Sequence, residues 1–366
     1  MTDDVFSPLE LRDVTARNRF VVSPMCQYSV EDRDGLATDW HRVHLGSRAT
    51  GGAGIVMTEA TAVEARGRIT PEDLGIWSDE HRDALEPVVD FVKSQGATPG
   101  IQLAHAGRKA SKSRPWEGSE PVYPDEGGWT VVGPSDEPWP YEQEPPATEA
   151  LDDDGIDEVI ESFREAARRS REAGFEIAEV HAAHGYLLHE FLSPVTNDRD
   201  DEYGGSFENR TRVVREVTEA VREAMGEDRA VFVRISATDW LDDRDSWDVK
   251  QSARLADDLY EAGADLVDVS SGGIHPDQDI EWTGPNYQLR FAEHIRNGRD
   301  TDIKVGTVGG ITSAEQADAV IRNDRADLAI VGREFLRDPY FPLHAAKELG
   351  REDAVDVPIQ YHRAFE

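Results

Sequence analysis

The amino-acid sequence predicts an α/β fold, a (β/α)8 TIM barrel with a long capping insertion after its third strand. Eight short apolar runs alternate along the chain with stretches of helical periodicity. Glycine-rich segments follow the last two runs, where barrels of this kind often bind phosphate. Because neither a linker nor an internal repeat interrupts the alternation, we expect residues 1–366 to form one domain.

The predicted strands are short runs bounded by polar or glycine residues: Arg19–Val22, Gly54–Glu59, Thr98–Leu103, Ile177–Val180, Ala230–Ile235, Leu266–Val269, Ile303–Val305 and Leu328–Val331. The predicted helices have apolar residues at a spacing of three or four: about Trp40–Thr50, Glu80–Ser94, Ile156–Ala173, Glu208–Met225, Lys250–Ala262, Asn286–Asn297, Ser313–Ile321 and Tyr340–Leu349. Ser206 is the expected N-cap of the helix that begins near Glu208.

Residues 115–150 interrupt the regular alternation between the third strand and its helix. This segment contains eight prolines, which disfavour both helix and central strand. A disordered loop is one interpretation, but Trp116, Trp129 and Trp139 give the segment enough apolar surface to fold. We therefore expect an ordered cap that bears a hairpin and covers the active face.

Polar side chains fall on inward-facing positions of the predicted strands. Alternate residues of a barrel strand point inward, which places Arg234 inside the barrel. The same parity applies to four more polar residues: Gln102, Glu179, Asp268 and Lys304. Isolated buried charges are costly, so these groups must pair or contact a ligand. The pattern predicts a cofactor at the barrel mouth; for Arg234, an ion pair with Glu179 or Asp268 is an alternative that could also coexist with it.

Two loops form a predicted phosphate site. One follows the seventh strand and the other follows the eighth, and glycines in both let the backbone approach an anion. Arg333 would add a fork of hydrogen-bond donors. Thr312 and Glu315 match a capping box for the helix after the seventh strand. The residues of this site are Gly309, Gly310, Gly332 and Arg333.

The segment after the fourth strand carries two imidazoles and a phenol within six residues: His181, His184 and Tyr186. Such a set can hold a polar atom and deliver a proton to its neighbour. Ordinary buried histidines are one alternative, and a metal site that adds His189 and Glu190 is another. We expect no metal, because zinc usually takes three or four ligands, no His-Glu-x-x-His motif is present, and the single cysteine is distant in sequence.

Two linked motifs here resemble those of the old yellow enzyme family, closest to its shorter, thermophilic-like class. They are His181-x-x-His184-Gly-Tyr186 and Tyr203-Gly-Gly-Ser-x-Glu-Asn-Arg210, and the resemblance extends from Ser23 to the C-terminus. It implies an FMN-dependent ene-reductase. NADPH or NADH would reduce FMN, and the reduced flavin would then reduce the activated C=C bond of an enone or enal.

The resemblance also implies roles for individual residues. Tyr186 would protonate the substrate, His181 and His184 would bind its carbonyl oxygen, and Tyr28 and Lys109 would contribute to substrate binding. The residues expected to bind the cofactor are Ser23, Pro24, Met25, Cys26, Ala60, Gln102, His181, Arg234, Gly309, Gly310, Gly332 and Arg333. Without the resemblance, Cys26 would be interpreted as a small buried hydrophobe.

Two other functions remain open from the residues alone. One is a phosphate-binding barrel lyase or aldolase without flavin, which would need a Schiff-base lysine, and Lys304 is the candidate at a strand. The other is a flavin-binding protein without catalytic activity. Bleaching of a yellow protein by NAD(P)H, followed by recovery on adding an enone, distinguishes all three.

The C-terminal tail, residues 351–366, is expected to be ordered. Ile359, Tyr361 and Phe365 are apolar anchors after Pro358. In the resembled class this tail crosses to a neighbouring subunit, whose active site its arginine reaches. That implies a homodimer or homotetramer with Arg363 in the partner's substrate site.

The composition is strongly acidic, with 39 Lys+Arg against 74 Asp+Glu and a formal net charge of −35. This charge repels nucleic acid and anionic membranes, so we expect neither as a partner. No signal-peptide pattern and no apolar run of membrane-span length is present, which predicts a soluble, cytoplasmic protein. The acids are interleaved with periodic apolar residues, as in cytoplasmic proteins of extreme halophiles.

We predict that the protein needs molar salt for full stability. Repulsion between exposed carboxylates is largely screened once the Debye length falls to about 3 Å near 1 M salt. The melting temperature should therefore rise steeply between low and molar KCl. A melting temperature that stays flat or falls over this range would contradict the halophilic interpretation.

Overall fold

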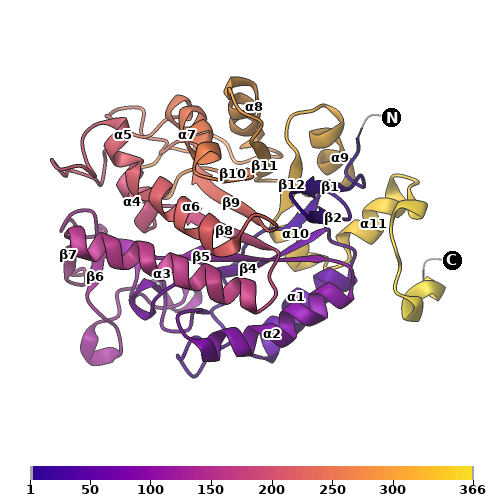
Figure 1. Cartoon of the computed structure of the whole chain (residues 1–366), viewed down its shortest axis with the longest axis horizontal. Coiled ribbons are helices and arrows are strands. Elements are labelled where there is room, and N and C mark those ends of the chain that lie inside the picture. The colour runs from indigo at the N-terminus through magenta and orange to yellow at the C-terminus, as the bar shows by residue number, and fades with distance from the viewer. Residues whose placement is uncertain (1–2, 365–366) are drawn as a thin grey trace.

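Eight parallel strands close into a barrel in the computed structural model, which describes residues 3–364 (Figure 1). Their order around the barrel is β10, β11, β12, β3, β4, β5, β8 and β9. All eight predicted strands are confirmed, with small differences at their ends: β3 Phe20–Val22, β4 Ile55–Ala62, β5 Thr98–Ala104, β8 Ile177–Ala182, β9 Ala230–Ser236, β10 Leu266–Ser270, β11 Lys304–Val308 and β12 Leu328–Val331. Since the strands run in parallel, their carboxyl ends meet on one face.

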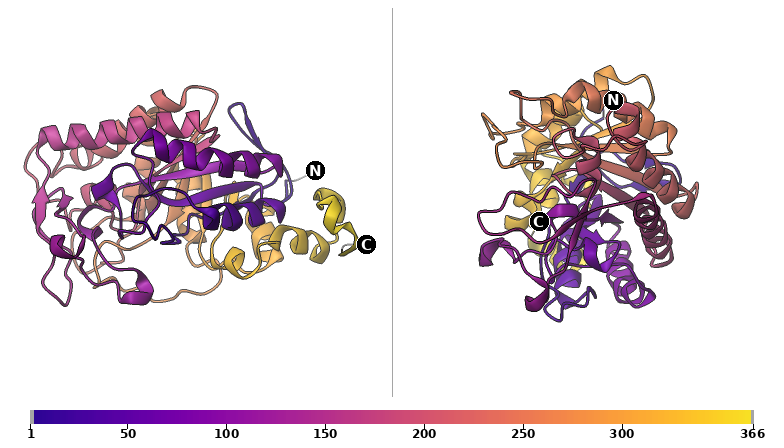
Figure 2. Two further views of the ribbon diagram at one scale, coloured as in Figure 1. Left: turned by 90° about the horizontal axis from the view of Figure 1, so that it is seen from below. Right: turned by 90° about the vertical axis from the view of Figure 1, so that its left-hand side faces the viewer.

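Helices cover the outside of the barrel (Figure 2). Those that alternate with the strands are α1 Asp39–Thr50, α2 Asp79–Ser94, α3 Asp153–Glu172, α6 Arg212–Met225, α7 Val249–Glu261, α8 Leu289–Gly298, α9 Ala314–Arg322 and α11 Phe341–Glu348. The residues at their ends explain where these helices begin and end. In α3, the Asp152 side chain caps the start by accepting from Gly155 N at 2.9 Å, and Arg169 and Arg171 lie in the last turn, where cations are favoured.

The helix predicted over Glu208–Met225 is divided at Thr211. A short helix, α5 (Phe207–Arg210), precedes α6, and the Ser206 side chain caps it by accepting from Asn209 N at 3.3 Å, as predicted. Two further short helices follow strands directly and were not predicted: α4 (Leu187–Leu192) after β8 and α10 (Arg333–Arg337) after β12.

An N-terminal hairpin closes the amino end of the barrel. Strands β1 (Leu9–Leu11) and β2 (Val14–Ala16) pair antiparallel, and their apolar side chains join the buried residues of the barrel interior, including Met57 and Phe232. This hairpin was not predicted, because its turn residues are Arg12 and Asp13 rather than a glycine pair, although Arg12 adopts φ +57.

The segment between β5 and α3 begins with a single antiparallel bridge between Lys112 and Pro121, whereas its two strands do not form a hairpin. Strands β6 (Val131–Gly133) and β7 (Thr148–Ala150) pair in parallel. The residues between them are proline-rich and long enough to return to the same end, which a parallel pair requires. Trp129 anchors the segment by donating from Nε1 to Arg66 O at 2.8 Å.

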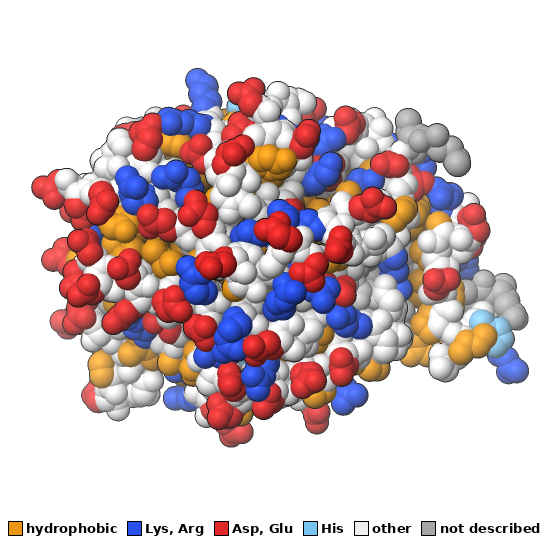
Figure 3. Space-filling model, in the orientation of Figure 1, with side chains coloured by type: hydrophobic (Ala, Val, Ile, Leu, Met, Phe, Trp, Pro, Cys, Tyr) orange, Lys and Arg blue, Asp and Glu red, His pale blue; other side chains and the backbone are white. Residues whose placement is uncertain are grey.

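Charged side chains of both signs cover the surface. Figure 3 shows carboxylates spread across the visible face among fewer basic groups. Many arginines form ion pairs with carboxylates of another element, as Arg82 of α2 does with Glu172 of α3. Within the described part of the chain, none of the helices has the length and apolar character of a membrane span.

Candidate active site

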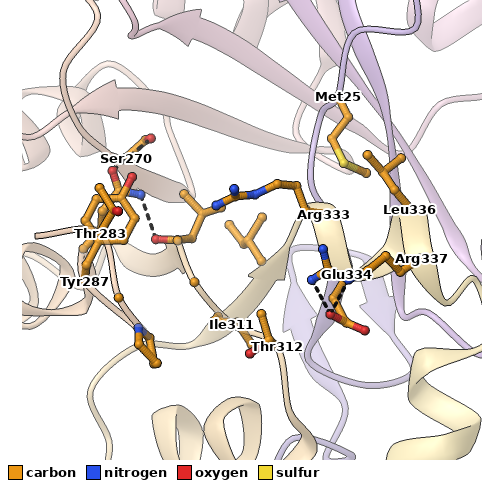
Figure 4. Close-up of a pocket in the computed structure, with 18 residues that line it drawn as sticks. Met25, Ser270, Thr283, Tyr287, Ile311, Thr312, Arg333, Glu334, Leu336 and Arg337 are labelled. Carbon is orange, nitrogen blue, oxygen red and sulfur yellow. Dashed lines mark hydrogen bonds and ion pairs between the residues drawn. The ribbon is translucent and has the colours of Figure 1, made fainter.

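A cavity of about 520 Å³ opens at the carboxyl ends of β10, β11 and β12. Its lining includes Met25, Ser270, Gly309, Gly310 and Arg333 (Figure 4). The Arg333 side chain extends into the middle of the cavity in Figure 4. Among residues 3–364, this guanidinium has neither a carboxylate partner nor a hydrogen bond. An unpaired arginine in so acidic a protein marks a site for an anion.

The glycines of the cavity allow close approach of the backbone. Gly310 has φ +70, and a Cβ there would lie 2.4 Å from Gly284 O. Gly332 differs, because a Cβ there would meet nothing closer than Met25 Sδ at 3.7 Å. The space beside Gly332 is therefore open toward the loop after β3, and an extended phosphate ester fits this arrangement. The residues predicted for the phosphate site are brought together here.

The capping box predicted for α9 is shifted by one residue. Ser313, not Thr312, is the N-cap, and its Oγ accepts from Gln316 N at 3.3 Å. Gln316 Oε1 in turn accepts from Ser313 N at 3.0 Å, so Glu315 takes no part in the box. Thr312 with Glu315 and Ser313 with Gln316 both match the capping-box motif. The extended backbone conformation at Ser313 shows that the second pair forms the box.

A buried polar layer lies inside the barrel, as strand parity predicted. Arg234 Nε is 3.3 Å from Asp268 Oδ2, and its Nη2 donates to Ser23 Oγ at 3.2 Å. Gln102 Nε2 donates to Glu179 Oε1 at 2.7 Å. Burial, then the charge of Asp268, raise the pKa of Glu179 to about 8. Glu179 therefore holds a proton at neutral pH, and the Asp268 carboxylate is balanced by Arg234.

His181, His184 and Tyr186 form a compact cluster at the end of β8. The His181 ring lies edge-on to both others, with centroid distances of 5.2 Å to His184 and 5.1 Å to Tyr186. His184 Nε2 is 2.8 Å from Ser270 Oγ. The rings of His181 and Tyr186, by contrast, make no hydrogen bond with any residue in the range 3–364. Two partly or fully buried polar groups without partners point to a ligand.

Electrostatics hold this cluster neutral. Burial, then the charge of Arg234, lower the pKa of His181 well below its usual value, and burial lowers that of His184 as well. Burial also raises the pKa of the Tyr186 phenol well above its usual value. At neutral pH the cluster therefore consists of two uncharged imidazoles and a protonated phenol. These groups can donate hydrogen bonds to an oxygen and supply a proton.

The loop after β3 brings Cys26 and Tyr28 to the same place. Both pack with Ala60, Tyr186 and other residues in one apolar cluster. Burial raises the pKa of the Cys26 thiol, and the neighbouring Cys26 sulfur, then burial, raise that of Tyr28. Tyr28 has φ +51, an uncommon conformation. It is held by Glu59, whose Oε2 accepts from Gln27 N at 2.7 Å.

Lys109 joins three parts of the mouth. Its Nζ donates to His184 O at 2.7 Å and to Gly273 O at 2.9 Å. The same ammonium lies 4.5 Å from the ring centroid of Trp139 and 5.1 Å from that of Tyr186. Burial, then the charge of Lys112, lower the pKa of Lys109 to about 7. Lys109 thus contacts the cap, the β8–α4 turn and the loop after β10 together.

Three residues considered from sequence lie elsewhere. Lys304 is the first residue of β11, opposite Leu266, and therefore lies at the amino end of the strand and away from the mouth. Arg363 lies in the C-terminal tail beside α11, outside this chain's own site, and Phe365 lies outside the described residues. His189 is bonded to Asp239 and to the Gly185 amide.

Some residues of the site were not predicted. Ser270 ends β10 and touches both His184 and the cavity, and its place at a strand end was a signal that could have identified it. Gln288 links two loops, accepting from Ser271 Oγ at 2.5 Å and donating to Val308 O at 2.8 Å. It lies in a loop with no sequence motif, and only the folded chain brings it here.

Comparison with known proteins identifies relatives over the whole chain. The sequence pattern of the NADH:flavin oxidoreductase / NADH oxidase family matches residues 4–352. The NADPH dehydrogenase of Geobacillus sp. (strain WCH70) is 46% identical over 361 residues, which cover 99% of this chain and 98% of that protein. The NADPH dehydrogenase of Bacillus subtilis (strain 168) is 43% identical over 366 residues, with 100% of both covered. The structure of the old yellow enzyme homologue from Zymomonas mobilis superposes with a TM-score of 0.77 at 27% identity, covering 94% of this chain and 93% of that one.

We predict that Glu179→Gln removes a pH dependence of stability. The folded-state pKa of about 8 lies above the ordinary 4.5, so the stabilisation from the bound proton is complete below pH 4.5 and is lost as pH rises through 8. In urea unfolding, the wild type should lose stability relative to the variant as pH rises from about 4.5 to about 8. Glu219→Gln, an exposed control, should follow the wild type. Parallel curves for wild type and Glu179→Gln would contradict the assignment.

Proposed function

Because the chain belongs to the NADH:flavin oxidoreductase / NADH oxidase family, in agreement with the resemblance to the old yellow enzymes, we propose that it reduces the activated C=C bond of α,β-unsaturated carbonyl compounds with electrons from NADPH. The observation that carries the proposal is the cluster at the end of β8. There, uncharged imidazoles lie beside a protonated phenol, and His181 and Tyr186 lack partners in the described chain. This set suits a carbonyl oxygen and an adjacent carbon that needs a proton.

Family membership confirms the predicted cofactors, FMN and a nicotinamide reductant. The site fits FMN, since the unpaired Arg333 and the space beside Gly332 suit its phosphate. Gln102 and Arg234, in the polar layer below, would face the ring system, where a cation suits the charge of the reduced form. When bound there, FMN would supply the hydride-transfer chemistry between the nicotinamide and the alkene. NADPH is proposed over NADH because the two relatives described above are NADPH dehydrogenases.

Each residue of the cluster would have a separate role in the reaction. His181 and His184 donate hydrogen bonds to the substrate oxygen and stabilise the negative charge that develops there. Their lowered pKa values keep them uncharged, so each offers one N–H donor. Tyr186 holds the proton that goes to the carbon next to the carbonyl. Tyr28 and Lys109 would border the substrate, since both contact the same aromatic surroundings.

The alternatives lack support in the geometry. A Schiff-base lyase that uses Lys304 is disfavoured because that lysine starts β11 at the closed end. A passive flavin-binding protein would have no need for a protonated phenol beside His181, an imidazole without a hydrogen-bond partner in the described chain.

The function is tested by following the two half-reactions separately in Tyr186→Phe and wild type. NADPH should bleach the flavin at similar rates in both, because this step needs no proton from the phenol. Reoxidation by an enone such as cyclohexenone should be slowed roughly 10²–10⁴-fold in the variant. Rapid-mixing absorbance measures both. If the enone fails to restore the colour of reduced wild type, the proposed activity is wrong, and equal reoxidation rates would remove Tyr186 from it.

We also propose that the protein works as a homodimer, or as a tetramer of such dimers. The tail ends in a short 3-10 helix, Ile359–Ala364, whose apolar side chains are exposed, Ile359 at 73% and Tyr361 at 42%. In Figure 1 this tail projects from the barrel at the α11 side. Exposed apolar groups on a projecting segment favour a protein partner. The family resemblance supports a second copy, with Arg363 in that copy's substrate site.

Truncation before Gln360 should weaken the dimer and raise KM for enones, because the exposed Tyr361 and Arg363 are both removed. FMN content should remain normal, since Arg333 and the glycine loops are retained. Light scattering and steady-state kinetics measure these effects, and Arg363→Ala separates the charge from the apolar anchor. Unchanged mass and unchanged KM in the truncated protein would contradict the proposed role of the tail.

A further inference from the structure

Three buried histidines around the mouth share one bonding pattern. In each, Nδ1 lies within hydrogen-bond distance of a backbone N–H, at 2.9 Å from Thr38 N, 3.0 Å from Gly107 N and 2.9 Å from Gly185 N. In each, Nε2 faces a carboxylate: His41 and Glu59 at 3.2 Å, His105 and Glu64 at 2.7 Å, His189 and Asp239 at 3.0 Å. Because Nδ1 accepts, the ring proton resides on Nε2, which then points at the carboxylate.

The pair of His189 and Asp239 is the most enclosed of the three. Both side chains are fully buried. Asp239 Oδ2 also accepts from Ser193 Oγ at 2.6 Å and from Trp247 N at 2.8 Å. Asp239 therefore has three donors, which offset the cost of burying its charge. It connects the loop after β9 to α4 through one imidazole.

The backbone group that this pair holds lies between two residues of the reactive cluster. Gly185 follows His184 and precedes Tyr186. His184 has φ +60 and Gly185 has φ +70, so two successive residues adopt the left-handed conformation. A Cβ on Gly185 would lie 2.1 Å from Gly273 O, which shows how closely the turn is packed. A strained turn of this kind persists only where its surroundings hold it.

We propose that His189 and Asp239 are positioning residues for the reaction, which rests on the proposed function. They hold the Gly185 amide and thereby keep the His184 imidazole and the Tyr186 phenol in the orientation that the substrate needs. Neither residue reaches the cavity or the substrate surroundings described above. Their effect is geometric, and a displacement of about 1 Å in a reacting group can cost about 10²-fold in rate.

The test compares Asp239→Asn with wild type. The amide cannot accept from all three donors, so the imidazole loses its fixed orientation while the side-chain volume is retained. The Gly185 amide should exchange its hydrogen faster, by about tenfold or more, as measured by mass spectrometry of the peptide that contains it. Enone reduction should fall about 10- to 100-fold. The dissociation constant of a para-substituted phenol, read from its long-wavelength absorbance band with the flavin, should rise by a similar factor.

His81→Asn is the matched control. His81 is also buried, contacts Ser78 Oγ at 2.7 Å and Asp34 O at 2.9 Å, and within residues 3–364 makes no hydrogen bond to the β8–α4 turn that contains Gly185. It should lower the melting temperature without changing Gly185 exchange or phenol binding. If both variants change Gly185 exchange, enone reduction and phenol binding to the same extent, the effect is general destabilisation and the positioning role is wrong.

Unchanged exchange and unchanged phenol binding in folded, FMN-loaded Asp239→Asn would also overturn the proposal. If that variant does not fold, Ser193→Ala decides, because it removes one donor to Asp239 and leaves the imidazole in place. It should shift the same three measurements in the same direction, and no shift would refute the role. Failure of the wild type to reduce enones would reject the proposed function. The exchange rate of the Gly185 amide would still show whether His189 and Asp239 hold that amide in place.

Discussion

The ion pair between Arg234 and Asp268 is the interaction on which the mouth of the barrel depends. It lies on adjacent strands below the reactive cluster, where an uncompensated charge would be strongly destabilising. Glu179 stays protonated beside it, so the layer carries no net charge at neutral pH. Burial, then the charge of Arg234, lower the pKa of His181, and Arg234 also donates to Ser23 Oγ. One buried cation thus influences His181 and anchors the loop after β3.

The loops above this layer have little regular structure and are held by specific bonds. Glu59 holds the loop that carries Tyr28, and Lys109 joins the β8–α4 turn to the loop after β10. Glycines permit close backbone contact between loops at two places, Gly185 with Gly273 and Gly310 with Gly284. The rigidity that a reaction needs therefore comes from side chains and close packing rather than from hydrogen bonds of the sheet.

Charge is distributed very differently inside and outside. The surface carries the large excess of carboxylates, whereas the mouth contains Lys109, Arg234 and the unpaired Arg333. Most arginines outside the mouth are occupied in surface ion pairs, such as Arg168 with Glu172. An unpaired cation in the cavity of so acidic a protein favours an anion there over the rest of the surface.

The sequence by itself determined the barrel, because the period-two and period-3.6 patterns are local and each strand is long enough to show its buried face. It also placed His181, His184, Tyr186 and Arg333 at or just after the carboxyl ends of strands, since polar residues there stand out against apolar runs. Only the tertiary structure decided the partners of these residues: Asp268 rather than Glu179 for Arg234, Ser270 for His184, and the Asp239 that orients His189. The parallel pairing of β6 with β7 and the N-terminal hairpin were likewise hidden. These contacts either join residues far apart in the chain or lack a turn signal in the sequence. They depend on how the folded elements lie in space, which no local sequence pattern specifies.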